Sequence, residues 1–139
     1  MCIRDRFNVF NLAGSAISAQ NIRLDLTASN LANADTVAGS PEAAYRAKAP
    51  IFQAVYDEAM GSQGVAVRVV GVAEDQTPPE RQYAPGDPLA DENGYIYKPN
   101  VNAVEEMSNM MSASRAFKIN VEMMATSKEL LLRTLSIGQ

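Results

Sequence analysis

Hydrophobic residues near the start of the chain recur every three or four positions, as they do along one face of an α-helix. The segment from Phe7 to Asn33 contains no proline and a single glycine, Gly14. Because alternating steps of three and four are the period of a helix–helix seam, we predict one long helix that pairs with another helix. Its stripe consists of Phe10, Ala13, Ile17, Gln20, Leu24, Thr27 and Leu31.

A second stripe with the same spacing runs through the last third of the chain, where Asn102 to Ile137 contains neither glycine nor proline. A helix of about 34 residues would be roughly 50 Å long. Asn102 followed by Glu105 resembles a capping box, which predicts where this helix begins. The stripe consists of Ala103, Met107, Met110, Ser114, Phe117, Val121, Met124, Lys128, Leu131 and Leu135.

Between the two helical segments the hydrophobic period changes to two, and residues 40–99 contain all seven prolines. The sequences YRAKAPIFQAVY, GVAVRVVGVAED and GYIYKP are typical of strands, and QTPPERQYAPGDP is typical of turns. The sequence therefore predicts an α+β fold in which residues 1–39 and 100–139 form a discontinuous, coiled-coil-like domain of paired helices. Residues 40–99 are predicted to form an inserted β-hairpin or small β element.

A single pair of helices is too thin to cover both stripes from every side, and proteins in water seldom leave so much apolar area exposed. We therefore predict that neighbouring subunits cover it, and that in isolation the terminal helices are disordered around a partly folded insert. The predicted assembly interface comprises Phe10, Ile17, Leu24, Asn30, Leu31, Asn33, Met107, Met110, Phe117, Val121, Met124, Leu131 and Leu135.

Composition argues against catalysis and against several classes of partner. Histidine is absent and Cys2 is the only cysteine, so neither a Ser-His-Asp triad nor a cysteine-rich zinc site can form. A net charge of −4 and the lack of tryptophan give no attraction to nucleic acid. No apolar run is long enough for direct membrane insertion. We predict a protein without enzymatic activity, cofactor or metal.

The acidic segment GDPLADENG raises one alternative, a helix-tethered β-rich module that binds calcium. Aligning Gly94 with the invariant glycine of an EF-hand loop puts Leu89 at the first ligand position and Asn100 at the last. Both positions need an oxygen ligand, and the last needs a bidentate glutamate. A solvated turn is the simpler interpretation, and calorimetric titration with calcium distinguishes the two.

The segment TASNLANADT at residues 27–36 resembles the N-terminal signature of the flagellar axial proteins, which form the rod, hook and hook-associated structures. FNVFNLAGSAISAQ, YRAKAPIFQ, YAPGDPLADENGYIYKPNVNAVEEM and the closing LLLRTLSIGQ, in this order, resemble the basal-body rod proteins within that family. The resemblance covers nearly everything from Phe7 onward, whereas MCIRDR departs from it. Another axial protein is the nearest alternative, and the small insert favours the rod over the hook.

The resemblance implies a structural subunit of the bacterial flagellar rod, which crosses the periplasm and transmits torque from the motor to the hook. Its partners would be copies of itself, other flagellar rod proteins and the flagellar type III export apparatus. Export by that route needs no cleaved signal peptide, and the N-terminal sequence contains none of the usual kind.

The amides of Asn30 and Asn33 are three residues apart on one helical face. One interpretation is that Asn33 ends the helix in the left-handed conformation that asparagine tolerates. The other is that both amides fix the register between the terminal helices or between subunits, since an amide both donates and accepts hydrogen bonds.

Overall fold

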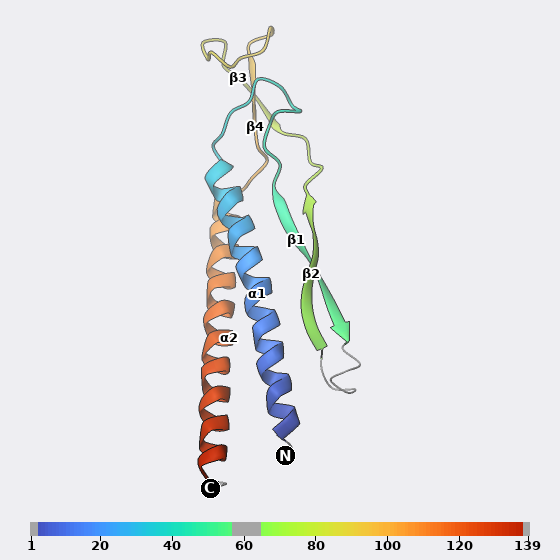
Figure 1. The fold of residues 1–139 in the computed structure, drawn as a ribbon. Coiled ribbons are helices and arrows are strands. Elements are labelled where there is room, and N and C mark those ends of the chain that lie inside the picture. The colour runs from blue at the N-terminus through green and yellow to red at the C-terminus, as the bar shows by residue number, and fades with distance from the viewer. Residues whose placement is uncertain (1–2, 57–64, 138–139) are drawn as a thin grey trace.

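The computed structural model describes residues 3–56 and 65–137. Two long helices, α1 (Ile3–Asn33) and α2 (Ala103–Ile137), lie side by side and antiparallel, with both chain ends at the same end of the molecule (Figure 1). The α+β prediction with paired terminal helices is confirmed. α2 begins where the capping pattern predicts, because the Asn102 Oδ1 accepts the backbone N–H groups of Val104 at 3.1 Å and Glu105 at 3.3 Å.

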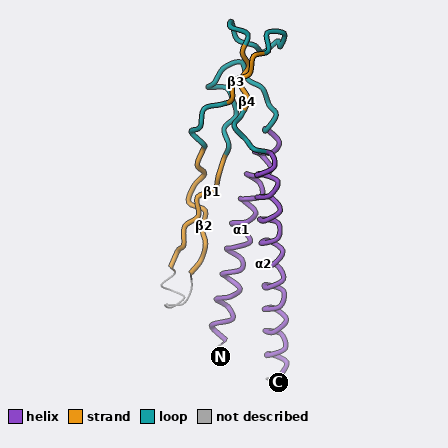
Figure 2. Tube along the Cα trace, turned by 180° about the vertical axis from the view of Figure 1, so that it is seen from behind, coloured by secondary structure: helices purple, strands orange, loops and turns teal. Residues whose placement is uncertain are grey.

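The inserted segment forms two separate pieces rather than one sheet. The longer piece is an antiparallel hairpin of β1 (Lys48–Tyr56) and β2 (Val65–Glu74). It runs alongside α1 and contacts it through both strands, as Figures 1 and 2 show from opposite sides. The pairing register shifts between Ile51 and Phe52, and a bulge of this kind increases the local twist of a ribbon.

In the shorter piece, β3 (Glu80–Tyr83) pairs with β4 (Tyr95–Lys98). This piece lies past the C-terminal end of α1 and the N-terminal end of α2 (Figure 1). Together with the loops around it we call it the end-knob, residues 34–44 and 76–101. The prediction of a turn was wrong for Glu80–Tyr83. All four of its residues are exposed, so the segment carries no alternation of apolar and polar residues and is a strand only through pairing with β4.

The end-knob is closed by contacts between segments far apart in sequence. Ala38 forms a β-bridge with Tyr97, and a Cβ added at Gly39 would lie 2.9 Å from the backbone oxygen of Leu89. Gly94 has a φ of 81° and ends the turn before β4. A larger residue at position 39 would therefore force the two loops apart.

Burial within the chain is slight. The buried hydrophobic residues of the described part are Ala13, Ala19, Ala44, Ile96 and Ala113, and no large side chain there is fully buried. Half of the exposed large hydrophobic side chains lie on α2: Val104, Met107, Met111, Ile119, Val121, Met123, Leu130, Leu132 and Leu135. The described chain thus leaves many of its large apolar side chains exposed.

Candidate assembly interface

The α1 half of the helix seam lies where its pattern predicts. Ala13 and Thr27 are buried, and Phe10, Ile17, Leu24 and Leu31 are all partly buried. Arg23 donates to the Asn109 Oδ1 of α2 at 3.3 Å. The Oε1 atom of Gln20 is buried without a hydrogen-bond partner among the described residues. This part of the seam therefore combines partly buried large apolar side chains with small buried ones and one amide oxygen that has no partner among the described residues.

The α2 half differs from the predicted stripe at every second position. Met110, Phe117, Met124 and Leu131 are partly buried, whereas Met107, Val121 and Leu135 are 51%, 42% and 68% exposed. The remaining positions of the buried seam lie one residue earlier and are occupied by Glu106, Ala113, Asn120 and Ser127.

The most buried position of the shifted seam is occupied by a small residue. Ala113 is 0% exposed, and small residues at a crossing allow two helix backbones to approach closely. The apolar positions one residue later are then turned away from α1. As an account of the seam within one chain the predicted stripe was wrong at these positions, whereas their place in an interface between subunits stays a prediction.

The positions turned away form a second run with the same three-and-four spacing, which we call the outer stripe of α2. Such a run is the pattern that one more helix or an apolar groove would cover. Lys118 and Lys128 are its only charged members. The outer stripe comprises Val104, Met107, Met111, Ser114, Lys118, Val121, Ala125, Lys128, Leu132 and Leu135, all exposed except Ser114.

Asn30 is 3% exposed and directed at β1, not at α2. Its Nδ2 donates to the Lys48 oxygen at 2.9 Å, and its Oδ1 accepts the Lys48 N–H at 2.9 Å. The Tyr45 hydroxyl donates to the same Oδ1 at 2.9 Å. The amide thus joins α1 to the start of the hairpin within one chain, a long-range contact that no local pattern signals.

Asn33 is partly buried and its Nδ2 donates to the Ser29 oxygen of its own helix at 2.8 Å. The interpretation that it adopts the left-handed conformation was wrong, because no residue of the described part other than glycine has a positive φ. The helix does end at Asn33, but the residue that caps it is Thr36, whose N–H and hydroxyl both donate to the Asn33 oxygen.

The acidic segment of the end-knob uses its carboxylates to hold turns. The Asp91 Oδ1 accepts the N–H groups of Tyr95 and Asn93, each at 2.9 Å. The bond from Tyr95 is the main reason that the pKa of Asp91 lies below its usual value. The Tyr97 hydroxyl donates to Asp91 Oδ2 at 3.3 Å. Burial is the main reason that the pKa of Tyr97 is raised, and the negative charge of Asp91 raises it further.

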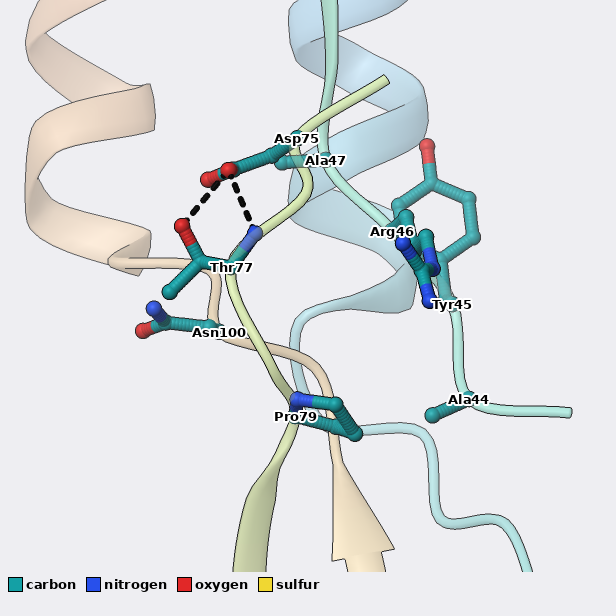
Figure 3. A pocket seen from close by; sticks show the side chains of 8 residues that line it. All are labelled: Ala44, Tyr45, Arg46, Ala47, Asp75, Thr77, Pro79 and Asn100. Atoms are coloured by element: carbon teal, nitrogen blue, oxygen red, sulfur yellow. Dashed lines mark hydrogen bonds between the residues drawn. The ribbon is translucent and has the colours of Figure 1, made fainter. Parts of the chain in front are cut away.

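A small cavity lies where the hairpin meets the end-knob, between Tyr45, Asp75 and Pro79 (Figure 3). The Asp75 Oδ1 accepts the Thr77 hydroxyl at 2.6 Å and the Thr77 N–H at 2.9 Å, and these bonds lower the pKa of Asp75. The cavity volume is about 10 Å³, which is roughly the space that one water molecule occupies. It offers no room for a substrate or cofactor.

The described residues also hold no group of three or more acidic, cysteine or histidine side chains placed to bind a metal ion. No helix in the part of the chain that the structure describes is long and apolar enough to cross a membrane. Two larger open hollows lie along α1, one against the hairpin and one between β1 and α2. The long helices, their exposed apolar face and the hairpin are together typical of a subunit of a filament.

Comparison with families of known proteins identifies the class of protein to which this chain is similar. Residues 10–39 match the family described as Flagella basal body rod protein, and residues 92–137 match the family described as Flagellar basal body rod FlgEFG protein C-terminal. The two matches cover most of α1 and α2, the elements that form the helix pair.

Relatives that align over nearly the whole chain show which kind of rod protein it is. The chain is 50% identical to the flagellar basal-body rod protein FlgC of Salmonella typhimurium, 49% identical to that of Escherichia coli O157:H7 and 46% identical to that of Yersinia enterocolitica. Each alignment spans 132 residues, 95% of this chain and 97% of the relative. The chain therefore belongs to the FlgC family of flagellar basal-body rod proteins, and it is a structural subunit of the flagellar basal body.

Proposed function

We propose that this rod subunit polymerises through its terminal helices, with the outer stripe of α2 as the main surface that neighbouring subunits cover. The observation that carries the proposal is the run of exposed Met, Val and Leu at three-and-four spacing along nearly the whole of α2. Exposed apolar area of this extent is rare on a chain that works alone. A partner that covers it would gain hydrophobic free energy in proportion to the area removed from water.

Long helical seams suit a shaft that transmits torque. Sliding one helix along another would expose apolar side chains along the whole contact, so resistance to shear grows with the length of the seam. The lysines at positions 118 and 128 add a requirement, because an ammonium group within such a contact needs an acidic or polar partner on the neighbour. Residues 1–39 and 100–139 would act together as the assembly unit, and residues 40–99 as its outer attachment.

The partners that fit this proposal are copies of the same chain and other proteins of the rod. A rod that crosses the periplasm would receive its subunits through the flagellar type III export apparatus, without a cleaved signal peptide. Neither assembly nor export needs a catalytic group on this chain, and we propose that it has no enzymatic activity. The exact neighbours depend on how the outer stripe is shared between them.

A matched pair of substitutions on α2 tests the proposal. Val121 belongs to the outer stripe, whereas Ile119, also exposed and β-branched, lies two residues away on the opposite side of the helix. In cells that lack their own copy of the gene, Val121→Glu should abolish swimming in soft agar and reduce the yield of basal bodies at least tenfold. Ile119→Glu should retain more than half of both.

Normal swimming by the Val121→Glu cells would refute the outer stripe as an interface. Equal loss in both variants would mean that any charge on α2 is harmful, which also contradicts a contact specific to this face. Immunoblots of the secreted fraction separate a failure of assembly from a failure of export.

A further inference from the structure

The hairpin of β1 and β2 is a two-stranded ribbon, so each strand has one edge without a partner strand. Such edges carry unpaired N–H and C=O groups. Two-stranded ribbons twist strongly, and Figure 1 shows the strands crossing, so that β1 is next to α1 near the end-knob and β2 is next to it further down. A different strand edge therefore meets α1 at each end of the hairpin.

At the end-knob side, α1 meets the β1 edge with an asparagine. Lys48 is opposite Glu74 in the register, and its outward N–H and C=O are both bonded by the Asn30 amide at 2.9 Å. One donor and one acceptor bonded to the same residue are what a paired strand supplies in an antiparallel ladder. The Asn30 side chain thus takes the place of a third strand at this residue.

Further down, α1 meets the β2 edge with a serine. Val67 is opposite Ala54 in the register, and its outward N–H donates to the Ser15 Oγ at 3.3 Å. The Ser15 hydroxyl donates in turn to the Leu12 oxygen at 2.8 Å, which fixes its orientation. Asn30 and Ser15 are fifteen positions apart, roughly 22 Å along the helix, so the hairpin is held near both of its ends.

The direction of the Asn30 amide is fixed by a further contact. The Tyr45 hydroxyl donates to its Oδ1 and lies 3.1 Å from the Ser29 Oγ. Exchanging the two amide ends would break both bonds with the Lys48 backbone, since its N–H cannot accept and its carbonyl cannot donate. An aspartate in this place would set a carboxylate oxygen against the Lys48 carbonyl.

We propose that Asn30 and Ser15 are positioning residues that fasten the free edges of the hairpin to α1 and set its register along the helix. The face that the hairpin presents to α1 consists mainly of valine and alanine, and such small side chains interlock too little to stop the hairpin from sliding along the helix. Two directional hydrogen-bonding sites prevent it. The helix and the hairpin then move as one body, which does not depend on the surface that joins subunits.

Asn33 is the matched control, since it is the same residue type on the same helix and bonds only its own helix. Hydrogen exchange measured by mass spectrometry in purified basal bodies should show about tenfold faster exchange at Lys48 and its neighbours in Asn30→Asp. In Asn33→Asp, exchange at the same amides should stay within twofold of the unaltered chain, as should the α2 amides in both variants.

Equal acceleration in the two variants would overturn the proposal, as would Lys48 amides that already exchange like those of a free peptide in the unaltered chain. Should Asn30→Asp yield no basal bodies, Ser15→Ala tests the weaker site. It should accelerate exchange a few-fold at residues 65–70 only, and an unchanged rate at Val67 would overturn the proposal.

Discussion

The two long helices have similar lengths but very different surroundings. α1 is covered by α2 along one side and by the hairpin along another, and its buried residues Ala13, Ala19, Thr27 and Asn30 belong to these two contacts. α2 is covered along one side alone. The two paired helices therefore differ in their contacts: α1 packs against both α2 and the hairpin, whereas α2 packs against α1 and keeps an exposed apolar surface.

The side chains on the remaining face of each helix agree with this division. On α1 the exposed positions after Leu12 are polar or small, whereas α2 carries half of the exposed large hydrophobic residues of the described part. A mutation on α1 should therefore act first on the fold, and one on the outer stripe should act first on assembly. The exposed positions among residues 9–33 of α1 are Val9, Asn11, Leu12, Ser18, Asn21, Asp25, Ala28 and Ala32.

The largest effect is expected from enlarging an alanine on the covered side of α1. Ala13 is 1% exposed, and Ala13→Leu would overpack the seam, at a cost of about 1–3 kcal/mol. Ala28 is exposed on the same helix, and Ala28→Leu should change stability by less than about 0.5 kcal/mol. Heating purified basal bodies and following release of this subunit measures both.

Equal tolerance of leucine at the two positions would contradict the closely packed seam. A strong effect of Ala28→Leu alone would show instead that the free face of α1 is an interface, which would remove the contrast between the helices.

A smaller effect of opposite sign is expected at Gln20. Its buried Oε1 has no partner among the described residues, and a buried acceptor left without a hydrogen bond costs about 1–3 kcal/mol. Gln20→Leu should strengthen the helix pair by about 1 kcal/mol and raise the temperature at which the subunit is released. A lower release temperature would mean that the amide has a partner in the assembled rod.

The smallest effect is expected from pH, and it concerns the end-knob that joins the two helices. Because the folded-state pKa of Asp91 is below its usual value, its contribution is complete above about pH 4. It is lost as the pH falls through the folded-state pKa, where the carboxylate gains a proton and its bonds to backbone N–H groups weaken.

Tyrosine fluorescence of the purified chain, titrated from pH 7 to pH 2, should report this loss through the neighbouring Tyr95 and Tyr97. Asp91→Asn should flatten the acid step. Two identical titration curves would show that another carboxylate is responsible.

The sequence was sufficient for the helices and the main strands, since their periods of 3.6 and two extend over many residues. It was insufficient for the α2 seam, because the apolar residues Met107 and Val121 each lie one residue after a partly buried position of the seam. Periodicity alone cannot decide between these neighbouring runs, because both have the same three-and-four spacing. The bonds of Asn30 to Lys48 were also beyond prediction, because they depend on how the ribbon twists onto α1. That the isolated chain has disordered terminal helices stays a prediction.

The backbone connects α1 to α2 at the end-knob side of the molecule (Figure 1). The far ends of the two helices are held together by side chains alone. A helix of this length is about 52 Å long, so tilting it by about 5° at the end-knob moves its tip by roughly 4–5 Å. The packing between α1 and α2 must therefore hold the angle between the helices along their whole length, because a change too small to disturb the loops would still part the far tips.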